Sequence, residues 1–171
     1  MSRSGYSDCD GDNWALIRWR GAVKSAIRGA KGQAMLKEAL AALDAMQNKR
    51  LASESLVNAD GEFCTLGALG YARGLDMSKV DPEDREAVAS LFGVAEALAA
   101  EIMFLNDEFC DGRRLVRFEI CGPMRHFYPH WEEHNRSKWM PDPLAAERRW
   151  EYMRNWVASQ IVDSETNKVA L

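Results

Sequence analysis

The residues of this chain that are best suited to chemistry are concentrated in one short stretch. All three histidines and two of the four cysteines lie between positions 110 and 134, as Cys110, Cys121, His126, His130 and His134. Thiolates and imidazoles are preferred ligands of tetrahedral zinc, so the stretch holds enough donors for one structural ion. Ten residues separate the two cysteines, whereas zinc fingers usually separate theirs by about two to four, because one tight turn presents both sulfurs. A structural zinc site therefore stays one interpretation.

The end of this stretch carries a second pattern. His130 and His134 are four residues apart, which places them on one face of a helix with Glu133 beside them. His-x-x-Glu-His is the inverted zinc-peptidase pattern, in which the glutamate acts as a base toward a metal-bound water. The pattern needs a third protein ligand downstream, and Glu147 and Glu151 belong to a helix whose apolar face is committed to the core. A zinc-dependent hydrolase is therefore an alternative with an incomplete ligand set.

The same stretch also has a purely structural interpretation. The histidines would decorate an amphipathic segment, with Phe127, Trp131 and Trp139 packed inward and the two thiols buried as small apolar groups. Short motif matches without a confirming context are commonly accidental. The metal content of the purified protein separates this interpretation from both zinc interpretations.

A stripe of cations on the first expected helix, residues 14–29, forms the other candidate site. Arg20, Lys24 and Arg28 recur every four residues and therefore share one helical face. Trp14 and Ile17 lie among the cations, although a solvated face is normally polar throughout. The candidate partner-binding residues are Trp14, Ile17, Arg18, Arg20, Lys24, Arg28 and Lys31.

The charge distribution offers two kinds of partner for this face. Residues 17–50 carry eight basic and two acidic side chains, hence +6, whereas the whole chain carries −4, so the remainder carries −10. An acidic protein anchored by Trp14 and a nucleic acid both suit such a basic face. A solvated face paired with the acidic remainder is the third interpretation. The sequence pI of about 5.5 argues against strong nonspecific DNA binding, which usually needs a basic domain.

Composition indicates one folded domain over residues 1–171. Hydrophobic residues make up 47% and charged residues 28% of the chain, as in ordinary globular proteins. No apolar run approaches the roughly 18 residues that span a bilayer, and the N-terminus has no apolar secretory segment. We therefore expect a cytoplasmic protein with reduced thiols and no membrane partner.

Hydrophobic periodicity predicts a mainly α fold: one helical domain with a short β-hairpin and an inserted loop and helix segment. Residues 1–12 are expected to form a loop. The expected helices cover residues 14–29, 33–46, 66–73, 81–93, 94–105, 129–139 and 144–161, with a short hairpin or an irregular turn over 51–64 and one strand over 113–120.

Several short motifs of the chain, taken together, resemble those of a known group of sequences. They are Gly5–Asp8, Ile17–Val23, Ser25–Gly29 with Gly32–Gln33, Cys64–Ala68, Asp81–Asp84 and Asn106–Glu108. As a set they resemble a family of small, uncharacterised proteins encoded by bacteriophages and prophages, over about residues 5–108 and again over 147–161. The resemblance implies a phage or prophage setting and brings no assigned activity. The link after Asn106–Glu108 is shorter in that family, so residues 109–141 are expected to be an insertion that contains the cysteines and histidines.

These observations favour a non-enzymatic binding protein of phage or prophage origin. We expect it to bind a host protein or protein complex in the host cytoplasm through the basic face of residues 14–29. Counter-defence or host take-over would fit a small phage protein, by analogy only. The alternatives are a zinc-dependent hydrolase that uses His130, Glu133 and His134, and a nucleic-acid-binding protein, whose affinity would fall steeply with salt.

Overall fold

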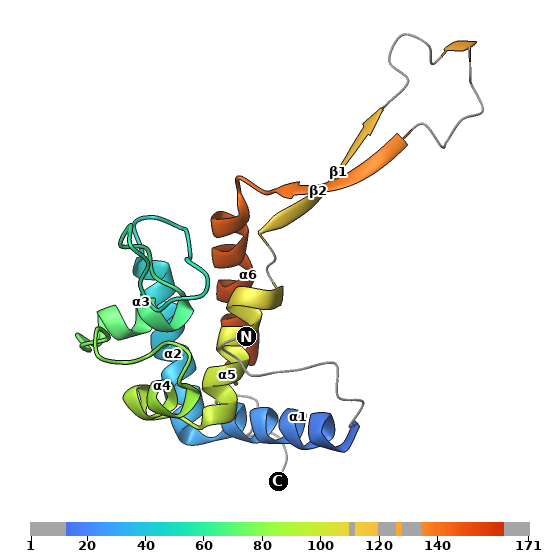
Figure 1. Cartoon of the computed structure of the whole chain (residues 1–171). Helices are drawn as coiled ribbons and strands as arrows, with labels where there is room; N and C mark the ends of the chain where they lie inside the picture. Colours follow the sequence, from blue (N-terminus) through green and yellow to red (C-terminus); the bar gives the residue numbers. More distant parts are fainter. Residues whose placement is uncertain (1–12, 110–111, 120–125, 128–134, 163–171) are drawn as a thin grey trace.

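The computed structural model describes residues 13–109, 112–119, 126–127 and 135–162, and within them the chain is mainly α, as predicted. Helices form the body, and one two-stranded ribbon projects from it (Figure 1). The elements in chain order are α1 (Asn13–Arg28), α2 (Ala30–Ala45), α3 (Thr65–Ala72), α4 (Arg85–Phe92), α5 (Glu96–Phe104), the π-helical turn η1 (Leu105–Phe109), β1 (Arg113–Glu119), β2 (Asn135–Pro141) and α6 (Ala145–Gln160).

Helix α2 is the centre of the core. Its buried Met35, Leu36, Ala39 and Leu43 recur at spacings of three and four, so one face of the helix is apolar along its length. This face packs between α3 and α6, and α6 contributes the fully buried Met153 and Val157. Burial of this apolar surface is the main driving force that holds the helices together.

Helix α1 crosses one end of the body and is attached by a tight corner (Figure 1). The corner is close because Gly32 of α2 lies against the backbone of α1: an added Cβ would lie 2.0 Å from the Ala26 carbonyl oxygen. Only Val23 of α1 is buried among the residues whose burial is described. Most of α1 therefore faces solvent, and its cations stay accessible.

Both ends of α4 follow local capping rules. The carboxylate of Asp84 accepts a hydrogen bond from the Ala87 amide at 3.0 Å and begins α4. Gly93, at φ +67°, ends it in the left-handed conformation that glycine adopts without strain. The break expected at Gly93 is confirmed, but the helix begins at Arg85, because Asp81 and Pro82 belong to a preceding turn closed by the Asp84 amide.

The region between α2 and α3 holds less strand than expected. Val57 and Phe63 form one isolated antiparallel bridge rather than a hairpin. The side chain of Asn58 accepts hydrogen bonds from the amides of Asp60 and Glu62, at 3.0 and 2.8 Å, and shapes the turn between them. Hydrogen bonds to the Asn58 side chain therefore hold this turn in place of a ladder of backbone bonds between two strands.

The ribbon confirms one expected element and corrects another. Strand β1 matches the expected strand, and it pairs antiparallel with β2 in a register that places Leu115 opposite Trp139 and Phe118 opposite Arg136. The expected helix over 129–139 is wrong over 135–139, because pairing with β1 satisfies this backbone in a ladder. The inward packing expected of Phe127 and Trp139 is also wrong, since both side chains are exposed.

In the described part of the chain, no single helix has the length and apolar character needed to cross a membrane. Taken together, α4 and the helical segment 96–108 pass that test of length and composition, but they are bent by 108° relative to each other.

Candidate functional site

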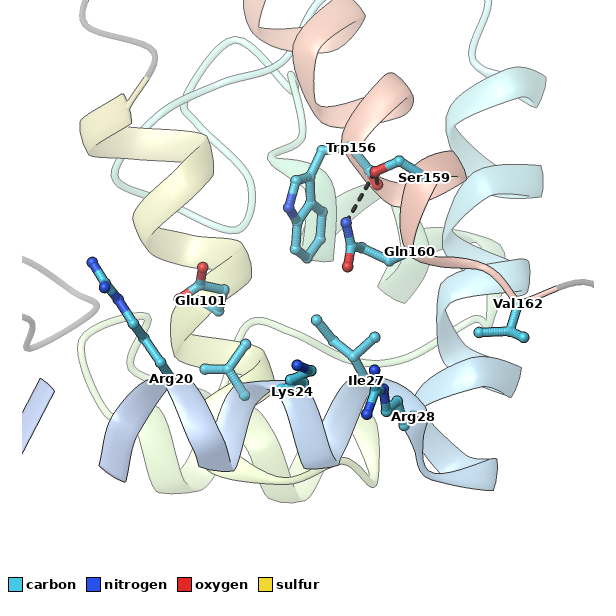
Figure 2. Close-up of a pocket in the computed structure, with 10 residues that line it drawn as sticks. Arg20, Lys24, Ile27, Arg28, Glu101, Trp156, Ser159, Gln160 and Val162 are labelled. Atoms are coloured by element: carbon cyan, nitrogen blue, oxygen red, sulfur yellow. Dashed lines mark hydrogen bonds between the residues drawn. The ribbon is translucent and has the colours of Figure 1, made fainter. Parts of the chain in front are cut away.

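The cationic stripe of α1 forms one wall of an open groove. Arg20, Lys24 and Arg28 line this groove, which has a volume of about 420 Å³. The facing wall is the last turn of α6, which contributes Trp156, Ser159 and Gln160, with the Gln160 amide bonded to the Ser159 hydroxyl (Figure 2). The groove therefore combines a positively charged wall with an indole, an amide and the Ser159 hydroxyl. We call it the α1–α6 groove.

The floor of the α1–α6 groove is apolar. Val23 and Ile27 lie between the cations along α1 and belong to its core-facing side. Their positions follow from the helical repeat, because residues three and four apart share a face. A bound segment would therefore meet charge at the rim and apolar surface beneath it.

One glutamine fixes the two walls relative to each other. Gln33 of α2 donates from Nε2 to the carbonyl oxygens of Ile27 and Gln160, at 2.8 and 2.9 Å. Its Oε1 accepts a hydrogen bond from the Val162 amide at 2.8 Å. These bonds connect the end of α1 to the end of α6, so the groove is built into the fold rather than formed by loose ends.

A single carboxylate from α5 lies at one end of the groove. Glu101 lines it beside Arg20 and accepts a hydrogen bond from the Trp19 Nε1 at 3.3 Å. Within the described part of the chain, Arg20, Lys24 and Arg28 form no ion pair at 4.0 Å or less. The groove lining thus carries more positive than negative charge, and its cations are available to an anionic partner.

The other predicted partner-binding residues lie outside this groove. Trp14 and Ile17 are 72% and 57% exposed near the start of α1, N-terminal to the groove. The Arg18 guanidinium donates to the Trp14 carbonyl oxygen at 3.4 Å, and Lys31 is exposed in the first turn of α2. The predicted set therefore divides into a groove wall of three cations and an adjacent exposed surface with two large apolar side chains.

Sequence reasoning did not predict the facing wall. The apolar stripe expected on residues 144–161 places Trp156 in the core; its side chain is partly buried and also lines the groove. Gln33 and Gln160 had no assigned role. A polar Ser159–Gln160 pair beside an amphipathic tryptophan is the signal that marked this edge of α6, but nothing local connects it to α1.

The predicted metal site falls almost wholly outside the described residues. Cys110, Cys121, His130 and His134 lie there, as does Glu133, so no geometry bears on them. His126 is described and exposed, with its ring 4.0 Å from that of Phe127 between centroids. Among the residues that the structure describes, no group of three or more Cys, His, Asp or Glu side chains is placed to hold a metal ion. The zinc interpretations stay predictions.

Two of the motifs that carry the resemblance, Cys64–Ala68 and Asn106–Glu108, have structural roles. Asn106 is buried, and its Oδ1 accepts hydrogen bonds from the amide and hydroxyl of Thr65 at 3.1 and 2.9 Å. Cys64 caps α3: its buried sulfur accepts from the Gly67 amide at 3.4 Å. Both motifs attach the start of α3 to the core.

Comparisons with known proteins return no match to this chain. No family model matches, and neither the search of curated proteins nor that of solved structures finds a similar protein. A function for the chain is therefore argued from the geometry of its own residues.

Proposed function

We propose that this chain is a non-enzymatic binding protein whose α1–α6 groove holds an acidic segment of a partner protein. The observation that carries the proposal is the wall of three cations at four-residue spacing, without ion pairs among the described residues, opposite Trp156 and Gln160. Guanidinium groups bind carboxylates with paired, charge-assisted hydrogen bonds. A groove of about 420 Å³ accommodates a few side chains of a peptide.

The mixed chemistry of the groove favours a peptide over a nucleic acid as its occupant. Its apolar floor suits an aliphatic side chain. The Ser159 hydroxyl donates to the Trp156 carbonyl oxygen at 2.7 Å and accepts from Gln160 Nε2 at 3.0 Å, and the second hydrogen of that Nε2 suits a peptide carbonyl. The exposed Trp14 and Ile17 on the adjacent face are of the kind that anchor protein interfaces. The net charge of −4 opposes binding of nucleic acid over the general surface.

The resemblance to small phage and prophage proteins supplies the proposed setting. In that setting the partner is a host protein or protein complex, and the interaction takes place in the host cytoplasm. Counter-defence or host take-over is the proposed outcome, and it rests on analogy with other small phage proteins.

Charge reversal in the groove tests the proposal. The double variant Arg20→Glu/Lys24→Glu places two anions on the groove wall, and the double variant Lys37→Glu/Lys79→Glu changes the net charge equally on other exposed surfaces. Partners are captured from a bacterial host lysate, and the purified partner is then titrated calorimetrically. We expect the groove variant to weaken binding about tenfold or more, because it places like charges against an acidic segment. Equal affinities for the two variants would contradict the proposal.

Photo-crosslinking locates the contact independently of charge. A benzophenone side chain at Ser159 lies in the groove, whereas the same group at the exposed Ser90 of α4 does not. We expect a crosslinked product with the partner only from position 159, and the mass of the crosslinked peptide identifies an acidic segment. A crosslink to nucleic acid from position 159 would instead favour the alternative partner class.

A further inference from the structure

The ribbon of β1 and β2 is a second charged surface, and the α1–α6 groove does not account for it. Directly paired residues of antiparallel strands lie on the same face, and successive residues alternate between faces. By register, one face therefore carries Arg113, Leu115, Arg117, Glu119, Asn135, Ser137, Trp139 and Pro141. The opposite face carries Arg114, Val116, Phe118, Arg136, Lys138 and Met140.

Both faces of the ribbon are cationic. The two strands contain five basic residues, Arg113, Arg114, Arg117, Arg136 and Lys138, and one acidic residue, Glu119. All five basic side chains are exposed, and none forms an ion pair with another described residue. In a chain of net charge −4, this cationic arm is set apart from an acidic remainder, which orients it toward an anionic partner.

Both faces also expose large apolar side chains. Leu115 and Trp139 are 55% and 53% exposed on one face, and Phe118 and Met140 are 41% and 43% exposed on the other. The ribbon projects away from the helices, so neither face packs against the body (Figure 1). A two-stranded ribbon by itself is only marginally stable in water. Contact with a partner on both faces would cover these side chains and stabilise the ribbon.

The base of the ribbon is fixed to the helical body. The Asp142 amide donates to the Gly112 carbonyl oxygen at 2.8 Å and closes the two strands. The side chain of Asp142 is almost fully buried and pairs with Arg148 of α6 at 2.7 Å. The ribbon therefore emerges from α6 in a defined direction.

We propose that the β1–β2 ribbon is an arm that binds duplex DNA in its major groove. Each strand of seven residues is roughly 20 Å long at about 3.3 Å per residue. The major groove is about 12 Å wide and admits a two-stranded ribbon. Its two walls are phosphate backbones, so a ribbon between them meets negative charge on both sides. Arg113 and Arg117 face one wall, and Arg114, Arg136 and Lys138 face the other.

Because cations and large apolar side chains lie on both faces of the ribbon, duplex DNA fits it better than other polyanions do. A single strand stacks its bases on aromatic side chains that share one platform, whereas Phe118 and Trp139 lie on opposite faces. The major groove of A-form RNA is too narrow for side chains to read. A flat acidic protein surface would engage one face and leave the other exposed. This inference is independent of the α1–α6 groove, because the two surfaces share no residue.

Fluorescence anisotropy tests whether the ribbon binds duplex DNA. The affinity for a fluorescein-labelled 20-base-pair duplex of mixed sequence is measured at several salt concentrations. If all five cations contact phosphates, the slope of log K against log salt is about −4 to −5, at roughly −0.9 per contact. Arg113→Gln/Arg117→Gln removes the cations of one face, and Arg114→Gln/Arg136→Gln/Lys138→Gln removes those of the other. We expect the slope to shrink by about two and about three respectively.

Matched controls separate the ribbon from the rest of the surface. Lys37→Gln/Lys79→Gln removes two cations elsewhere, and Arg20→Gln/Lys24→Gln removes two from the α1–α6 groove; both are expected to leave the slope unchanged. Thermal unfolding of every variant followed by circular dichroism should lie close to that of the wild type, because the substituted side chains are exposed and the Lys79–Asp76 ion pair that one control removes is exposed as well.

Four outcomes would overturn the proposal. They are absence of duplex binding at 50 mM salt, slopes that the ribbon variants leave unchanged, tighter binding of a 20-nucleotide single strand than of the duplex, and equal competition by polyglutamate at the same concentration of charge. Loss of affinity from only one of the two face variants would exclude the placement between two phosphate walls.

Discussion

The Nε of Arg149 donates a hydrogen bond to the backbone carbonyl oxygen of Asn106 at 2.7 Å, and both residues are almost fully buried. The same guanidinium donates from Nη1 to the Leu51 carbonyl oxygen at 2.8 Å. One cation of α6 therefore satisfies backbone acceptors from the π-helical turn η1 and from the loop before α3. Since buried carbonyl groups are costly to leave unpaired, Arg149 joins three segments that are far apart in the sequence.

Replacing Arg149 should destabilise the fold strongly. Arg149→Met keeps much of the side-chain volume but leaves the carbonyl groups of Leu51 and Asn106 without these donors. We expect the free energy of unfolding to fall by about 2–4 kcal/mol, measured by urea denaturation followed by circular dichroism. Arg154→Met on the same helix removes only an exposed pair with Asp44 and should shift the midpoint little. Similar midpoints for the two variants would contradict this role of Arg149.

Hydrophobic periodicity in the sequence predicted most helices, because each helix has an apolar stripe that packs against a neighbouring helix. The stripe expected on residues 33–46 shows this directly: Met35, Leu36 and Leu43 are fully buried, and Leu40 is partly buried. The prediction of a helix over the β2 segment was wrong for the opposite reason. This segment, with Arg136 and Lys138, has no apolar stripe, and its conformation is decided by pairing with β1, which lies about twenty residues earlier. Such pairing overrides local propensity.

The candidate site was predictable on one wall only. Four-residue spacing on α1 was enough to align Arg20, Lys24 and Arg28. The facing wall depends on the packing of α6 across the end of the body, more than 120 residues further along the chain. Gln33 shows why the facing wall could not be predicted. Its side-chain amide forms hydrogen bonds with both walls, yet a lone glutamine in an amphipathic helix carries no pattern that points to such a role.

Gln33 should control the integrity of the α1–α6 groove. Gln33→Leu removes the bonds to the Ile27 and Gln160 carbonyl oxygens and to the Val162 amide. We expect a loss of about 1–3 kcal/mol in unfolding free energy and faster amide hydrogen exchange at Val162. Ala34→Leu, at an exposed position next to it, is the matched control. Unchanged exchange at Val162 in Gln33→Leu would show that the two walls are held by other contacts.

Asp76 provides a prediction for the dependence on pH. The Ser78 hydroxyl donates to Asp76 Oδ1 at 2.6 Å, the Ser78 amide donates to the same oxygen, and Lys79 lies beside Oδ2; together they lower the pKa of Asp76 below its ordinary value of 3.8. A depressed pKa stabilises the fold above the pKa of the unfolded chain, and this contribution is lost as pH falls through the folded value.

Removal of the Ser78 hydroxyl should raise the pKa of Asp76 toward 3.8, because the largest cause of the depression is lost. The measurement is a carboxyl carbon titration by NMR on wild type and Ser78→Ala. The difference in stability between the two proteins should be present at neutral pH and disappear in acid. Lys79→Ala should raise the pKa less than Ser78→Ala does; the reverse order would assign the depression to charge rather than to the hydrogen bond.

Gly67 should tolerate no side chain, whereas Gly21 should accept one. An added Cβ at Gly67 would lie 1.9 Å from the Leu56 carbonyl oxygen, a backbone atom that cannot move without displacing the loop before α3. At Gly21, in the exposed middle of α1, nothing lies within 4 Å of that position. We expect Gly67→Ala to cost about 1–3 kcal/mol or more through overpacking, and Gly21→Ala to stabilise by roughly 0.5–1 kcal/mol through helix propensity. Urea denaturation measures both, and a Gly67→Ala variant as stable as the wild type would show that α3 does not approach Leu56 this closely in solution.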